Sequence, residues 1–302
     1  KNIKDLISGH RVDINIDKKN PIDFILWKPS NSIEPGWKSP WGFGRPGWHI
    51  ECSAMSHALL GEEIDIHGGG IDLIFPHHEN EIAQSESRFG KKMAKYWVHN
   101  NFINFNDQKM SKSLGNLVKA RDFICDYNAE ILKFTILSVH YRSPLNFNSK
   151  QIKQSIIGLI RIYSALKYAK HILGNTTNGI TKKYNTFSQE FNKIIIAMNN
   201  DINTPSVFAT VFDMVRKFNF ITTNSKNKDE ILEFISLIKK IGKWLGLFSE
   251  PPEKFLNQLN LILLKERKIS INEINKAIKN REEARINKNY KKSDSIRNKL
   301  LK

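Results

Sequence analysis

The sequence predicts a chain of mixed class, in which an α/β part is followed by an all-α part. In residues 45–105, short apolar segments alternate with helical patterns, as in a parallel sheet with crossover helices. From Ser149 onward, apolar residues recur at helical spacing. The length of 302 residues and the hydrophobic content of 40% are sufficient for two or three domains with a sizeable core.

The elements of the α/β part follow from its pattern. We expect a helix around residues 50–60, a strand near Ile64, a helix from Pro76 to about Phe89 and a strand through residues 96–98. These elements supply only part of a doubly wound nucleotide-binding sheet, which needs more strands.

The all-α part is predicted to form a helical bundle. Four apolar stripes are expected to line its core, over residues 152–166, 191–198, 204–218 and 231–245. Thr204 is expected to cap the third helix, with Pro205 in the first turn.

After the bundle, closed by Pro251 and Pro252, we expect a linker to about Ser270 and then two short helices, at 271–287 and 290–301. These short helices carry a basic surface of Arg281, Arg285, Lys288, Lys291, Lys292 and Arg297. From the residues alone, a solvated helical hairpin is the preferred interpretation.

Net charge suggests the kind of partner. The 47 Lys and Arg against 30 Asp and Glu give +17, which favours a polyanion such as nucleic acid, although base composition of the coding DNA can also enrich lysine. With two cysteines, no signal peptide and no apolar run of membrane-spanning length, we expect a cytoplasmic protein that does not associate with a membrane.

Potential metal ligands concentrate between Arg45 and Glu81, which hold five of the nine histidines and Cys52. If Pro76 starts a helix, His77 and Glu81 share one face of it, while His78 should point elsewhere. Cys, His and Glu are all zinc ligands, and three of them with one open position is typical of a reactive site. The alternative is a buried cysteine beside solvated histidines.

A glycine triplet at residues 68–70 follows a short predicted strand. Glycine there lets a ligand approach the backbone, which would place His67, Gly70 and Asp72 at a pocket. A tight turn without a ligand is the alternative interpretation. Trp48 is equally compatible with a pocket wall and with ordinary core.

Residues 107–116, DQKMSKSLGN, form a predicted mobile cationic loop. Lys109 and Lys112 are suited to holding a polyphosphate and to stabilising the charge that develops as pyrophosphate leaves. Most such segments are merely solvated basic turns, but KMSKS is the signature loop of class I aminoacyl-tRNA synthetases.

Several longer strings extend this resemblance. GWHIECSAM, DIHGGGIDLIFPHHENEIAQ and KMSKSLGN, in that order, resemble the cysteinyl-tRNA synthetase family. The similarity continues through YRSPLN at 141–146, DINTP at 201–205 and the segment 281–300.

The resemblance implies one Zn²⁺ per chain, with Cys52, His77 and Glu81 as ligands. In this family the zinc selects cysteine by binding its thiolate, and Trp48 would form part of the side-chain pocket. A serine hydroxyl is a poor ligand that stays protonated, so discrimination can dispense with editing.

The resemblance also implies roles for the remaining candidates. Asp72 would hold the substrate ammonium group, while His67 and Gly70 would line the ATP and adenylate site. Lys112, with Lys109, would stabilise the phosphates of ATP, which binds with Mg²⁺.

The resemblance implies four regions. Residues 1–116 would be the carboxyl-terminal half of a Rossmann-like class I catalytic domain, containing the zinc site and the KMSKS loop. Residues 117–149 would be a connecting helical segment that contacts the tRNA stem, 150–250 a helical-bundle tRNA-binding domain, and 265–302 a small basic domain that helps to recognise the anticodon.

The implied function is that of a cysteine-tRNA ligase, which activates cysteine with ATP and transfers it to tRNA(Cys). Two alternatives remain: the related ligase that joins cysteine to an amino sugar in mycothiol synthesis, and a truncated, non-catalytic tRNA-binding relative. We expect a monomer.

One departure from the family concerns the amino-terminal part. The family's CGPTVYD string, which supplies a further zinc cysteine, and its HIGH motif do not occur in these 302 residues. Cys125 is not expected to replace that cysteine, because the apolar pattern around it predicts a core position. We therefore expect the isolated chain to be inactive.

Overall fold

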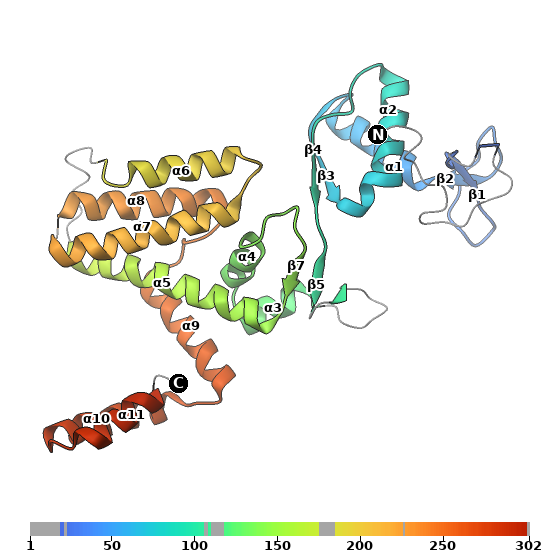
Figure 1. Ribbon diagram of the computed structural model, residues 1–302. Helices are drawn as coiled ribbons and strands as arrows, with labels where there is room; N and C mark the ends of the chain where they lie inside the picture. The colour runs from blue at the N-terminus through green and yellow to red at the C-terminus, as the bar shows by residue number, and fades with distance from the viewer. Residues whose placement is uncertain are drawn as a thin grey trace. The chain divides into compact units, whose positions relative to one another are not determined.

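The structure is a computed structural model that describes residues 19–20, 23–105, 108–109, 118–174, 185–225 and 227–300. The chain divides into two compact units (Figure 1). The first, here called the α/β unit, comprises residues 1–102 and 141–144. The second, the helical unit, comprises residues 103–140 and 145–302.

The α/β unit is built around a βαβ motif, which confirms the predicted order of elements. Strands β3 (Ile64–Gly70) and β4 (Ala94–Asn100) pair in parallel, with Ile64 opposite Ala94, and helix α2 (Glu79–Phe89) connects them. Helix α1 (Trp48–Leu60) packs against α2. An antiparallel pair, β1 (Trp27–Pro29) and β2 (Gly44–Pro46), precedes α1.

The glycine triplet lies inside β3 rather than after it, which corrects the tight-turn interpretation. A Cβ on Gly69 would lie 2.6 Å from Cε1 of the His78 ring. The glycine therefore makes room for a side chain, in addition to any ligand. Two short helical turns, η2 (Ile71–Leu73) and η3 (Ile74–His78), then lead directly into α2.

The helical unit begins with a small three-stranded sheet of order β6-β5-β7. Its strands are β5 (Ile103–Phe105), β6 (Gln108–Lys109) and β7 (Leu145–Phe147). Helices α3 (Ala120–Asp126) and α4 (Ala129–Leu137) separate β6 from β7. Cys125 on α3 is exposed, so the predicted core position is wrong, whereas Phe123 two residues earlier is buried.

Four helices form the predicted bundle, and their buried faces carry its apolar core. They are α5 (Ser149–Leu173), α6 (Ser188–Asn199), α7 (Thr204–Asn224) and α8 (Lys228–Leu245). Asn203, not Thr204, caps α7, because its side chain accepts a hydrogen bond from the Ser206 amide. No helix among the described residues is long and apolar enough to cross a membrane.

The expected linker after the bundle is instead helix α9 (Pro252–Arg267), so that prediction is wrong. Pro252 occupies its first turn, where proline is tolerated because no intrahelical donor is needed. Buried Phe255 packs its ring 4.2 Å from Tyr163 of α5, which anchors α9. The two terminal helices are confirmed as α10 (Ile271–Ile286) and α11 (Tyr290–Leu300).

A buried carboxylate connects α4, α5 and the turn after α8. Glu130 is 6% exposed and accepts hydrogen bonds from the Tyr163 hydroxyl, at 2.9 and 3.0 Å, and from the Phe248 amide, at 2.8 Å. Burial raises the pKa of Glu130 despite these donors. The folded chain therefore binds this proton more tightly than the unfolded chain does.

Glu130→Ala should lower the free energy of unfolding by about 2–4 kcal/mol, because two buried donors lose their acceptor. The pKa of Glu130 is raised on folding, so wild type should lose stability relative to Glu130→Gln as the pH rises through the folded-state pKa. Denaturant unfolding followed by far-UV circular dichroism across that range measures both effects.

The control is Glu253→Gln, which changes an exposed carboxylate of α9 and should alter stability by less than roughly 1 kcal/mol. A difference between wild type and Glu130→Gln that stays constant with pH would contradict the raised pKa.

Candidate metal centre

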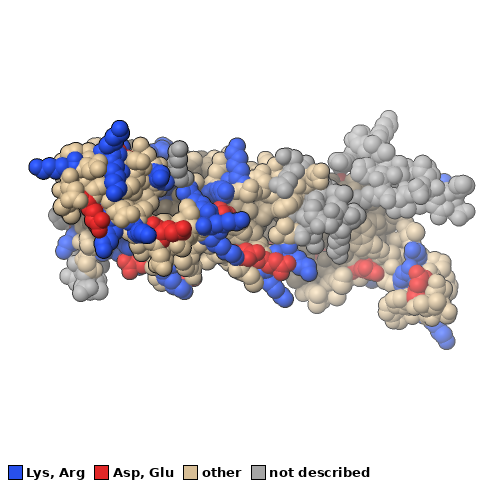
Figure 2. All heavy atoms as spheres, turned by 90° about the horizontal axis from the view of Figure 1, so that it is seen from below, with Lys and Arg blue, Asp and Glu red and all other residues tan. Residues whose placement is uncertain are grey.

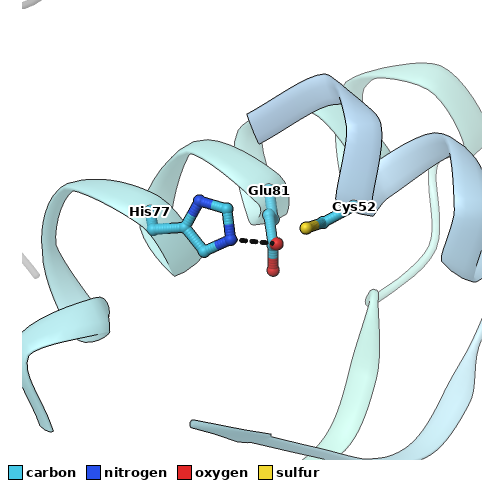
Figure 3. A group of neighbouring side chains, drawn as sticks. All are labelled: Cys52, His77 and Glu81. Carbon is cyan, nitrogen blue, oxygen red and sulfur yellow. Dashed lines mark ion pairs between the residues drawn. The ribbon is translucent and has the colours of Figure 1, made fainter. Parts of the chain in front are cut away.

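Three predicted ligands converge from three different elements of the α/β unit. Cys52 comes from the middle of α1, His77 from η3 and Glu81 from the first turn of α2. His77 Nε2 lies 2.8 Å from Glu81 Oε1, and one potential ligand atom from each of the three side chains lies within 4.8 Å of the others. Figure 3 shows the sulfur of Cys52 and the ring of His77 directed at the carboxylate from opposite sides.

The carboxylate of Glu81 is the most buried part of the site, at 1% exposure. Its Oε1 and Oε2 face His77 Nε2 and His67 Nε2 at 2.8 and 3.0 Å. Yet within the described part of the chain neither oxygen has a hydrogen bond of acceptable geometry. A buried carboxylate without such partners is costly, and a bound cation would satisfy it.

The chemistry of the donor set fits zinc. Tetrahedral zinc with bonds of about 2.0–2.3 Å separates its ligand atoms by about 3.3–3.6 Å, which lies inside the observed spread. Burial and the neighbouring Glu81 carboxylate raise the pKa of the Cys52 thiol. A divalent cation between the two groups would reverse this effect, since it favours the thiolate.

A second group meets the same carboxylate from the other side. His67, His78 and Glu81 also bring potential ligand atoms within 4.8 Å of one another. The expectation that His78 points elsewhere is therefore wrong. It precedes Glu81 by three residues, and residues three apart share a helix face, so the spacing already contained this signal.

Burial also shapes the chemistry of His78. It lowers the pKa of His78 to about 4, and the Glu81 carboxylate only partly opposes this effect. The Nδ1 of His78 lies 2.7 Å from Nε2 of His99 on β4. His99 is a neighbour that the predicted site lacked.

Tryptophan rings pack against the histidines of both potential ligand groups. Trp48 at the start of α1 stacks on His77, with 4.1 Å between the ring centroids, and half of its surface remains exposed. Trp97 of β4 packs against His67 at 4.6 Å and His78 at 5.1 Å. Trp48 is thus an open wall beside the ligands rather than ordinary core.

The other predicted residues fall in different places. Gly70 ends β3, the strand that carries His67, and Asp72 follows in η2, where it is half-buried. Lys109 ends β6 in the other unit, and only its backbone is described. Lys112 lies outside the described residues, so its predicted role remains a prediction.

Comparison with known protein families shows to which family this chain belongs. Residues 1–156 match the family model described as the tRNA synthetases class I (C) catalytic domain. The chain belongs to this synthetase family. Residues 193–249, from α6 to the end of the bundle, match the DALR domain. This match confirms the predicted resemblance to a class I synthetase family and the predicted fold class.

Individual relatives agree with this assignment. The synthetase chain is 46% identical over 309 residues to the cysteine-tRNA ligase of Bdellovibrio bacteriovorus and 44% identical over 308 residues to that of Syntrophotalea carbinolica. Each alignment covers 99% of this chain but only 64% and 63% of the relative.

A solved structure supports the fold of the synthetase. The LeuRS-tRNA-LeuAMS complex from Agrobacterium radiobacter K84 superposes with a TM-score of 0.58 at 11% identity, covering 73% of this chain and 33% of that one. At this identity the similarity concerns the fold alone.

Metal analysis tests the centre directly. We expect one zinc per wild-type chain, and Cys52→Ala, His77→Ala or Glu81→Ala should each weaken zinc binding at least tenfold, since even partners outside the ligand sphere have effects of that size. Competition with a chromophoric chelator measures the affinity.

Cys125→Ala is the matched control, because it removes an exposed cysteine of the other unit and should leave zinc binding unchanged. Zinc-free wild-type protein would contradict the centre. Two zinc ions per chain would show that His67 and His78 hold a second ion.

Proposed function

We propose that the protein is a cysteine-tRNA ligase, which forms cysteinyl adenylate and pyrophosphate from cysteine and ATP and then transfers the cysteinyl group to tRNA(Cys). The observation that carries this proposal is the group of half-buried Cys52 with buried His77 and Glu81, beside the exposed face of Trp48. The relatives from Bdellovibrio and Syntrophotalea bear the same name, and this chain spans just under two thirds of their length.

The amino-acid pocket is proposed at this group. Cys52, His77 and Glu81 would hold Zn²⁺, which supplies a Lewis acid that binds the substrate thiolate and lowers the pKa of the thiol. Trp48 would pack against the substrate side chain. Serine offers only a hard, protonated hydroxyl, so a pocket built on this bond rejects it strongly.

The remaining residues would act on the rest of the substrates. We assign the ammonium group of cysteine to Asp72, next to the site along the chain. His67 and Gly70 would line the adenylate position at the carboxyl end of β3, where ligands bind in such sheets. Lys109 and Lys112 would neutralise the phosphates of ATP and its Mg²⁺ complex as pyrophosphate leaves.

The helical unit is proposed to bind tRNA. Figure 2 shows Lys and Arg side chains spread over its visible face, with fewer Asp and Glu. The terminal helices α10 and α11 add a further basic group: Arg281, Arg285, Lys291, Lys292 and Arg297. Lysine and arginine bind phosphates and release counterions, so this surface suits the backbone of a tRNA better than an amino sugar.

Amino-acid selection can be tested on this chain by replacing zinc with cobalt(II), whose spectrum reports thiolate ligands. Cysteine should intensify the thiolate-to-cobalt charge-transfer absorption, because it adds a second sulfur ligand, whereas serine should not. His77→Ala should abolish the response, and Cys125→Ala should retain it. Equal responses to cysteine and serine would overturn the proposed pocket.

Binding to tRNA(Cys) should be strongly dependent on salt. Between 50 and 200 mM salt we expect the dissociation constant to rise by about 10-fold or more, as for other proteins that contact several phosphates. A double variant, Arg281→Ala with Arg285→Ala, should weaken binding and lower the salt slope. Lys95→Gln, on β4 of the α/β unit, is the control.

Filter binding at several salt concentrations gives both quantities. The amino-sugar ligase would be favoured instead if tRNA(Cys) bound no better than an unrelated polyanion.

A further inference from the structure

The ring of His77 is held from both of its nitrogen atoms. Nε2 faces the carboxylate of Glu81 at 2.8 Å, and Nδ1 lies 2.8 Å from Nδ1 of His49. His49 is three residues before Cys52 on α1, one helical turn away on the same face. The helix that supplies the thiol ligand therefore also supplies a partner for the imidazole ligand.

A contact between two Nδ1 atoms requires one proton, which can sit on either ring. Without a metal, the tautomer of His77 with its proton on Nε2 is favoured, because a lone pair on that atom would face the Glu81 carboxylate at 2.8 Å. Nδ1 of His77 then accepts from His49. With a cation on Nε2, the proton of His77 must be on Nδ1, which then donates to His49. The contact persists in both states with its direction reversed, which a carboxylate or carbonyl partner cannot provide because it only accepts.

Neighbouring contacts hold His49 in place. Its ring packs edge-on against Phe24, with 5.7 Å between the centroids, and stacks at 5.5 Å on Trp48. One turn further along α1, Ser53 Oγ donates to Gln84 Oε1 of α2 at 2.6 Å. The first two contacts hold the His49 ring, and the third joins α1 to α2 one turn beyond it.

We propose that His49 is a positioning residue for the metal, acting through the Nδ1 atom of His77. This inference deepens the proposed function and rests on its metal centre. His49 keeps the buried His77 ring in one orientation while Nε2 of His77 changes from a protonated nitrogen to a metal ligand. Loss of this partner should reduce metal affinity without removing any ligand atom.

Three substitutions separate hydrogen bonding from packing. His49→Asn keeps a donor and an acceptor near the position of Nδ1, His49→Gln moves them to that of Nε2, and His49→Phe keeps only a ring. We expect His49→Phe and His49→Gln to raise the zinc dissociation constant about 10–100-fold, as for other partners outside the ligand sphere, with most of the loss rescued by His49→Asn.

His57→Phe is the matched control, since His57 lies two turns further along α1, stacked on Phe89 at 4.2 Å. Chelator competition gives the affinities, and circular dichroism checks folding. Equal affinities for the Asn, Gln and Phe variants would overturn the role of the hydrogen bond.

Nitrogen NMR of the histidine rings supplies a readout that packing alone would not change. In the wild-type chain, zinc should move the proton of His77 from Nε2 to Nδ1 and that of His49 from Nδ1 to Nε2. An unchanged His49 tautomer overturns the inference while zinc binding still supports the centre. Failure of the wild type to bind zinc overturns both.

Discussion

The α/β unit depends on one constraint, the burial of the Glu81 carboxylate between imidazoles and a thiol. A charged group in such a place must have partners, and α1, β3 and η3 each deliver one: Cys52, His67 and His77. These requirements explain local features that would otherwise be unrelated. Gly69 leaves space for the ring of His78, and a hydrogen bond from Ser53 to Gln84 joins the two helices that supply Cys52 and Glu81.

The elements that supply the ligand atoms also determine the proposed selectivity of the pocket. The potential ligand atoms come from α1, η3 and the first turn of α2, so the packing of these three elements sets the distances between the ligand atoms. Trp48 opens to solvent directly beside them. In the proposed pocket, recognition through a bond to the metal would need little further shape discrimination.

Much of this could be predicted from the sequence, because the signals were local. The spacing of His77 and Glu81 on one helix and the apolar stripes of the bundle are periodic patterns. The predictions that were wrong also have physical reasons. Pro252 starts α9 because proline is tolerated in a first turn. Phe123 takes the inward face of α3, which turns Cys125 outward. The partner of His77 came from another helix, and spacing within one segment cannot show such a contact.

The described part of the α/β unit buries few apolar side chains, among them Ile64, Met93 and Ala94, whereas the helical unit has an extensive core. A metal ion that binds the folded unit and not the unfolded one would add a free energy that grows with the logarithm of its free concentration. The folded fraction of this unit would then follow the supply of zinc. In a cell short of zinc, the pocket would be lost because the unit unfolds as well as because the metal is missing. Proteases would then degrade the unfolded unit.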